Sequence, residues 1–118
     1  MTKLAFIGLG VMGYPMAGHL SQAGFDLSIY NRSADKAERW SNQHKGTRYQ
    51  TPAEAASGAD IVFACVGNDD DLREVTLSDH GAFTAMKPGA IFVDHSTVSA
   101  NVSRELAEIA TQSRLGYL

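Results

Sequence analysis

Apolar and polar positions along the chain follow two alternating patterns. Short apolar runs that end at glycine or polar residues predict strands, because they are too short to form buried helices. The segments between them place apolar residues three or four positions apart, which predicts helices with one apolar face. The strands are expected at residues 3–8, 25–31, 48–50, 60–66, 89–96 and 115–118, and the helices at 12–24, 34–43, 52–58, 69–77 and 99–113.

Residues at the ends of these segments have the chemistry that helix termini need. Ser33 is a candidate N-cap for the helix at 34–43, and Pro52 suits the first position of the next helix. Strands that alternate with helices over short connections imply parallel strands joined by right-handed crossovers. The sequence therefore predicts an α/β fold with a doubly wound parallel sheet, forming one domain over residues 1–118.

Composition and charge narrow the classes of function. Of the 118 residues, 44% are apolar and 19% are charged, which is ordinary for a globular domain. The formal net charge of −3, without a Lys/Arg cluster, argues against nucleic acid or an anionic membrane as a partner. The single cysteine, Cys65, suits a reducing compartment, and no apolar stretch reaches the roughly 18 residues of a membrane span. We expect a cytoplasmic protein without nucleic-acid or membrane partners.

Three glycines stand between the first predicted strand and the first predicted helix. Gly8, Gly10 and Gly13 form the pattern G-x-G-x-x-G. In this context the first glycine permits a tight turn, the second lets a pyrophosphate approach the backbone, and the third lets the helix pack closely on the strand. The helix N-terminus adds free N–H groups for the phosphates. The sequence predicts a dinucleotide site, and the alternative is a glycine-rich turn without a ligand.

The end of the second predicted strand suggests which dinucleotide binds. A cofactor with a free ribose 2′-hydroxyl is normally held there by Asp or Glu, whereas this chain has neutral Asn31 followed by Arg32 and Ser33. A guanidinium can fork onto phosphate oxygens and stack on an adenine ring. The combination favours NADP over NAD. The alternative is that Arg32 is a solvated loop cation and that cofactor choice is loose.

Four separated motifs resemble one known family in order and spacing. They are "FIGLGVMGYPMAGHL", "YNRS", "CVGNDDDLREV" and "VDHSTVSA", and with their connections they span essentially the whole chain. They look like the β-hydroxyacid dehydrogenases, the 3-hydroxyisobutyrate dehydrogenase and tartronate semialdehyde reductase group, which is related to 6-phosphogluconate dehydrogenase. The resemblance implies an oxidoreductase that transfers a hydride between NADP(H) and a small 3-hydroxyacid or semialdehyde.

The resemblance also implies roles for particular residues. Ser96 would hydrogen-bond the substrate and Thr97 would lie beside the nicotinamide, although a serine and threonine before a helix are also an ordinary capping arrangement. Asn68 and Ala100 stand where the family often has proline, which puts local loop shape and substrate preference in question. The cofactor-binding positions implied are Gly8, Leu9, Gly10, Val11, Met12, Gly13, Asn31, Arg32, Ser33, Val66, Gly67, Asp71 and Thr97.

The second half of the family's active site is expected to lie outside these residues. In the family, the last predicted strand continues into a segment that carries a catalytic lysine, and then into an all-helical domain that closes the substrate cleft and builds a homo-oligomer. Neither the lysine nor that domain is present in this chain. We therefore expect the isolated chain not to be catalytic.

Other readings remain open at this point. His95 is the only residue near Ser96 that could replace the lysine, and a packing or exposed role is the alternative. The four histidines lack metal-ligand spacing, so we expect no metal site. The competing functions are a binding module that holds NADP without turnover, and the cofactor domain of a 6-phosphogluconate dehydrogenase or imine reductase relative.

Overall fold

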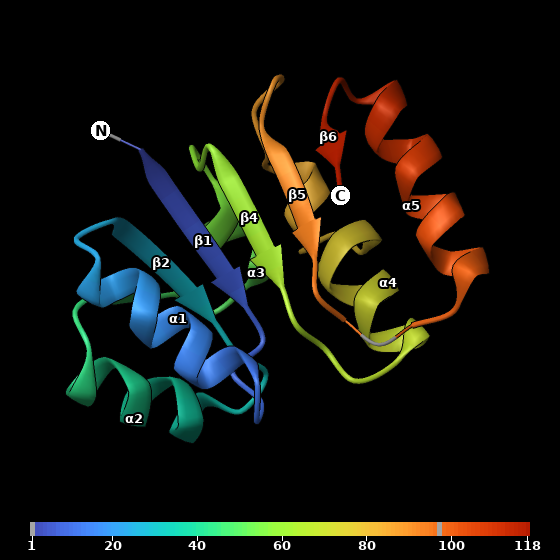
Figure 1. Ribbon diagram of the computed structural model, residues 1–118. Coiled ribbons are helices and arrows are strands. Elements are labelled where there is room, and N and C mark those ends of the chain that lie inside the picture. The colour runs from blue at the N-terminus through green and yellow to red at the C-terminus, as the bar shows by residue number, and fades with distance from the viewer. Residues whose placement is uncertain (1, 97) are drawn as a thin grey trace.

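The computed structural model describes residues 2–96 and 98–118. Within them, six strands form one parallel sheet in the order β3-β2-β1-β4-β5-β6, as Figure 1 shows. The predicted doubly wound α/β fold is thus confirmed. The strands are β1 (Lys3–Ile7), β2 (Asp26–Tyr30), β3 (Thr47–Arg48), β4 (Ile61–Ala64), β5 (Ile91–Asp94) and β6 (Gly116–Tyr117).

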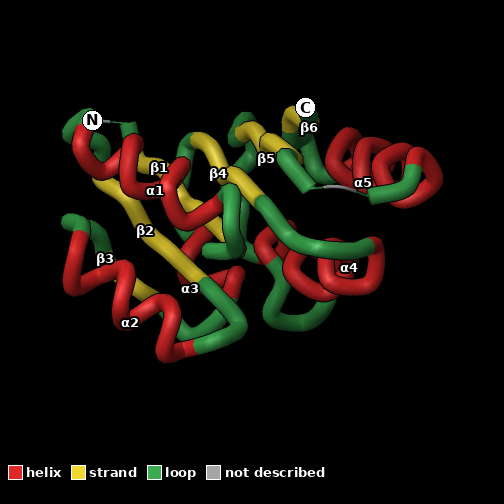
Figure 2. Tube along the Cα trace, turned by 60° about the horizontal axis from the view of Figure 1, so that its bottom comes forward, coloured by secondary structure: helices red, strands yellow, loops and turns green. Residues whose placement is uncertain are grey.

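Helices cover both faces of the sheet (Figures 1 and 2). Helices α1 and α2 pack on one face, and α3, α4 and α5 pack on the other. No helix in the described ranges is both long and apolar enough to cross a membrane. The helices are α1 (Gly13–Gln22), α2 (Ala34–Gln43), α3 (Pro52–Ala56), α4 (Asp69–Leu77) and α5 (Ala100–Gln112), with a short 3₁₀ helix at Ala82–Thr84 that the sequence analysis did not predict.

Alternation along β1 divides the interior into two cores. Leu4 and Phe6 face α1 and α2 and join a cluster that contains the fully buried Trp40. Ala5 and Ile7 face α3, α4 and α5 and join the larger cluster around Phe92. Because both faces are covered, the strands read as near-continuous apolar runs, which is the pattern that predicted them.

Side-chain caps begin helices α4 and α5. Asn68 Oδ1 accepts a hydrogen bond from Asp71 N at the start of α4, and Ser99 Oγ accepts one from Val102 N at the start of α5. Ser33 occupies the N-cap position of α2 as predicted, but its side chain makes no capping bond. Its hydroxyl is consequently not committed to the helix.

The topology creates a crevice at the centre of the sheet. β1 lies between β2 and β4, and the chain leaves β1 toward α1 on one face while it leaves β4 toward α4 on the other. At such a switch in strand order, the loops at the carboxyl ends of the strands separate, and ligands of open α/β sheets bind between them. The glycine turn and the loop after β4 line this crevice.

Candidate functional site

The turn between β1 and α1 depends on glycine at two of its three predicted positions. Gly8 has a φ of 96°, and a Cβ there would overlap the carbonyl oxygen of Cys65. A Cβ on Gly13 would overlap the carbonyl oxygen of Gly8, so α1 approaches β1 as closely as the backbone permits. A Cβ on Gly10 would meet nothing within 4 Å. Gly10 therefore faces open space, as a position that admits a ligand should.

Asn31 holds the glycine turn in place. Its Oδ1 accepts a 2.8 Å hydrogen bond from Leu9 N, and its Nδ2 donates to the carbonyl of Ser33 at 3.1 Å. The cofactor-binding role of Asn31 stays a prediction, and in the structure both ends of its amide join two loops. This hydrogen bond from Leu9 satisfies the backbone N–H of a fully buried residue.

A cavity of about 270 Å³ opens between the carboxyl ends of β1, β2 and β4. It brings together most of the cofactor-binding residues that the sequence predicted. The predicted residues that line this cavity are Gly8, Gly10, Asn31, Arg32, Ser33, Val66, Gly67 and Asp71.

The other predicted cofactor residues lie around the glycine turn or outside the description. Leu9 and Val11 line a neighbouring hollow of about 410 Å³, which Arg39 of α2 also borders. Met12 is 61% exposed and Gly13 is buried under the turn. Thr97 lies outside the described residues.

Charged groups of both signs meet at the outer end of the 270 Å³ cavity. Arg32 Nη1 lies 3.1 Å from Asp71 Oδ1, and Lys36 and Glu74 also line the cavity. Tyr30 lines the same cavity. Burial raises the pKa of its phenol, the carboxylate of Glu74 raises this pKa further, and Arg32 opposes the change. The Tyr30 hydroxyl therefore stays protonated and remains a hydrogen-bond donor at neutral pH.

Cys65 reaches the same cavity but is not activated. Burial raises the pKa of its thiol, and the negative charge of Asp94 raises it further, against a hydrogen bond from the backbone of Gly13. Because the thiolate is the nucleophilic form, Cys65 is an inert wall of the site.

Ser96 is held by hydrogen bonds from two directions. Its Oγ accepts from Val66 N at 2.8 Å, and its own N–H donates to Asp94 Oδ1 at 2.7 Å. The other oxygen of Asp94 accepts from the Tyr117 hydroxyl at 2.9 Å; burial raises the pKa of Tyr117, and this contact raises it further. With its oxygen engaged by Val66, the Ser96 hydroxyl keeps its proton free to donate to a ligand.

His95 is directed elsewhere. Its ring stacks on Phe63 with centroids 6.1 Å apart, and it is exposed. Within the described residues, no group of three or more His, Cys, Asp or Glu side chains is placed to hold a metal ion.

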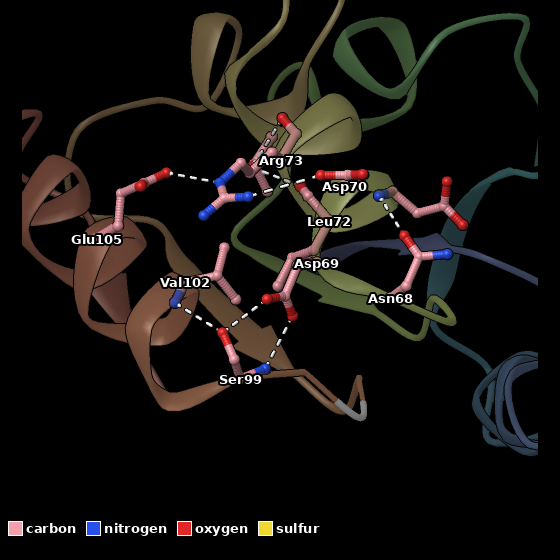
Figure 3. A network of polar contacts seen from close by, with 10 residues as sticks. Asn68, Asp69, Asp70, Leu72, Arg73, Ser99, Val102 and Glu105 are labelled. Atoms are coloured by element: carbon pink, nitrogen blue, oxygen red, sulfur yellow. Dashed lines mark hydrogen bonds and ion pairs between the residues drawn. The ribbon is translucent and has the colours of Figure 1, made fainter.

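A second network joins the helices that follow β4 and β5 (Figure 3). The carboxylate of Asp69 accepts from Ser99 N at 2.8 Å and from Ser99 Oγ at 2.6 Å, and these bonds lower the pKa of Asp69. Arg73 Nε lies 3.1 Å from Glu105 Oε2 and extends the connection along α4 and α5. The segment after β5, which carries Ser96 and Ser99, is therefore tied at both residues to the segment after β4, which borders the cavity.

Sequence reasoning missed one residue of the cavity, Lys36, and one contact between residues that it had predicted, Arg32 and Asp71. Lys36 could have been found, because it lies three positions after Ser33 and so on the same side of the predicted helix. The pairing of Arg32 with Asp71 had no such signal, because these residues are 39 positions apart and meet only after the sheet has formed.

The parallel sheet, the glycine turn and the cavity at the strand-order switch define a dinucleotide-binding domain. Residues 3–118 match the family model described as the NAD binding domain of 6-phosphogluconate dehydrogenase. The chain belongs to this family.

Relatives within the family are considerably longer than this chain. An uncharacterized oxidoreductase of Shewanella frigidimarina is 54% identical over all 118 residues, which make up 40% of its length. A probable mitochondrial 3-hydroxyisobutyrate dehydrogenase-like protein of Arabidopsis thaliana is 35% identical over 89% of this chain and 35% of its own. The structure of Mycobacterium tuberculosis 3-hydroxyisobutyrate dehydrogenase with L-serine superposes with a TM-score of 0.86 at 26% identity, over 99% of this chain and 39% of that one. The chain thus spans about two-fifths of these proteins.

Proposed function

We propose that this chain is the NADP-binding domain of an oxidoreductase that acts on a small 3-hydroxyacid or semialdehyde. The observation that carries the cofactor choice is Arg32, whose guanidinium lines the cavity directly after β2. The neighbouring position 31 holds an amide instead of the carboxylate that would repel a 2′-phosphate. The substrate class rests on the names of the Arabidopsis and mycobacterial relatives.

The residues present fit such a cofactor. Gly10 leaves open space where the pyrophosphate would approach the turn before α1, and the start of α1 adds the positive end of its helix dipole. Arg32 and the uncommitted hydroxyl of Ser33 would hold the 2′-phosphate, with Lys36 as a second cation on the cavity wall. Val66 and Gly67 would line the path toward the nicotinamide.

Ser96 would serve the substrate end of the site. NADPH, when bound, supplies a hydride to a carbonyl carbon, and the reverse step returns it to NADP⁺. The Ser96 hydroxyl, fixed by Val66 N, would donate a hydrogen bond to the substrate oxygen or carboxylate. The proton that completes the alcohol requires an acid, which we assign to a lysine outside this chain.

Calorimetric titration of the 118-residue chain with NADPH and with NADH tests the cofactor assignment. We expect tighter binding of NADPH, and a loss of about tenfold or more in NADPH affinity in Arg32→Ala, because a charge-assisted bidentate contact is lost. Arg48→Ala is the matched control, since Arg48 lies on the exposed edge strand β3 and lines neither the cavity nor the neighbouring hollow. Equal affinities for the two cofactors, or an Arg32→Ala variant that binds NADPH normally, would overturn the assignment.

A second measurement tests the catalytic part of the proposal. Mixing the chain with NADPH and a small semialdehyde should give no loss of NADPH absorbance above the uncatalysed rate. Turnover by the 118 residues alone would show that the proton donor lies among them and would contradict the assignment to an outside lysine.

A further inference from the structure

Arg32 pairs with an acidic residue of α4. Its Nη1 lies 3.1 Å from Asp71 Oδ1, and this ion pair joins the loop after β2 to the first turn of α4. Both residues line the 270 Å³ cavity, so the ion pair forms part of its wall. The group proposed to bind a 2′-phosphate is therefore held by a carboxylate of the protein itself.

Local structure explains why Asp71 is free to make this contact. At the start of α4, Asn68 Oδ1 accepts from Asp71 N at 2.9 Å, so the capping role falls to Asn68. The two preceding acids are used elsewhere, since Asp69 binds Ser99 and Asp70 lies 3.6 Å from Arg73 on the outer surface (Figure 3). Of the three acids in this turn, Asp71 is the one that lines the cavity.

We propose that Asp71 is a specificity-determining residue that opposes the binding of a 2′-phosphate. This inference rests on the proposed function. A 2′-phosphate would compete with Asp71 for the Arg32 guanidinium and would lie beside a charge of its own sign. A ribose 2′-hydroxyl meets neither obstacle, and it can donate a hydrogen bond to the Asp71 carboxylate. Asp71 thus lowers the preference for NADPH that Arg32 creates.

The exposure of the pair sets the size of the effect. The Arg32 side chain is 75% exposed and that of Asp71 is 25% exposed, so solvent weakens their attraction. Exposed ion pairs correspond to changes of up to about fivefold in an equilibrium constant. Removal of the repulsion between Asp71 and a phosphate adds to this. We expect Asp71→Asn to bind NADPH about three- to tenfold more tightly than the unmodified chain.

The test compares Asp71→Asn with Asp70→Asn in the 118-residue chain. Both variants remove one negative charge from the first turn of α4, but the Asp70 side chain is 96% exposed and does not line the cavity. Affinities are measured for NADPH and NADH, and for 2′,5′-ADP and 5′-AMP as probes of the adenosine end. Asp71→Asn should strengthen NADPH and 2′,5′-ADP binding and leave NADH binding unchanged or weaker, and Asp70→Asn should change all four little.

The double variant Arg32→Ala/Asp71→Asn shows whether the two residues act through each other. The gain from Asp71→Asn should shrink when Arg32 is absent, because no guanidinium then remains to be released. Weaker NADPH binding in Asp71→Asn, or equal gains in Asp71→Asn and Asp70→Asn, would overturn the inference and leave the NADP assignment standing. If Arg32→Ala keeps the preference for NADPH, or if no probe binds, the proposed function fails and the inference fails with it.

Discussion

The two ends of the candidate site are built in different ways. At the adenosine end, the turn after β1 takes its shape from glycines whose backbones touch other backbones, as at Gly8 and Cys65. At the substrate end, the loops after β4 and β5 are joined by side chains, through Ser96 to Val66 and through Asp69 to Ser99. The first construction tolerates almost no change of residue, whereas the second can be altered one hydrogen bond at a time.

The largest expected effect comes from breaking the adenosine end at Gly8. A methyl group at Gly8 would overlap the Cys65 carbonyl at a φ of 96°, a conformation that other residues rarely adopt. We expect Gly8→Ala to lower the free energy of unfolding by about 2–4 kcal/mol, from backbone strain together with overpacking. Chemical denaturation followed by circular dichroism measures this loss.

Gly10→Ala is the control for that variant. Its methyl group would stand in open space, so we expect a near-normal free energy of unfolding together with weaker dinucleotide binding. If both glycine variants unfold alike, the turn is not held by the contact between Gly8 and Cys65. If Gly10→Ala binds NADPH normally, the pyrophosphate does not approach the backbone there.

The next largest effect on stability is expected at the substrate end, from substitution of Asp94. Asp94→Ala would remove the acceptors of two part-buried groups, Ser96 N–H and Tyr117 O–H. We expect a loss of about 2 kcal/mol in the free energy of unfolding, because unpaired polar groups keep their desolvation cost. Asp94→Asn should lose much less, since an amide oxygen can still accept from Ser96 N. Equal stability of the Ala variant and the unmodified chain would show that Asp94 does not position Ser96.

The same contrast explains which parts of the molecule could be predicted from the sequence. Strands, helices and the glycine turn follow from local patterns, so α2 and α4 begin and end where the sequence placed them. The cofactor-binding role predicted for Asn31 stays a prediction, whereas its bond to Leu9 crosses 22 positions and follows from the pairing of β1 with β2. The contacts of Arg32 with Asp71 and of Ser96 with Val66 likewise join residues that become neighbours only in the folded sheet.

Two substitutions of Asn31 are expected to have smaller effects. They separate its structural role in the glycine turn from its proposed role in cofactor choice. Asn31→Ala would leave the buried Leu9 N–H without its acceptor, and we expect a loss of about 1 kcal/mol in the free energy of unfolding. Asn31→Asp keeps an acceptor for Leu9 N but puts a carboxylate beside the position proposed for the 2′-phosphate. It loses the donor to the Ser33 carbonyl, so we expect a smaller loss of stability than in Asn31→Ala, together with a shift of the measured preference from NADPH toward NADH. A loss of stability in Asn31→Asp as large as in Asn31→Ala would contradict the role of Oδ1 in the turn.

The smallest expected effect is a pH dependence at the junction between α4 and α5. Hydrogen bonds from Ser99 hold the pKa of Asp69 below its ordinary value of 3.8, whereas in the unfolded chain this carboxyl titrates near that value. The unfolded state therefore binds more protons in this range, so the contribution of Asp69 is present above about pH 3.8 and is lost as the pH falls through the lower folded value. In acid titrations followed by circular dichroism, the unmodified chain should lose stability more steeply below pH 3.8 than Asp69→Asn does. Asp70→Asn, whose carboxylate is almost fully exposed, should follow the unmodified chain. If Asp69→Asn and the unmodified chain lose stability in parallel, the contact between Asp69 and Ser99 contributes nothing measurable to the substrate end, which then depends on the bonds of Ser96 to Val66 and Asp94.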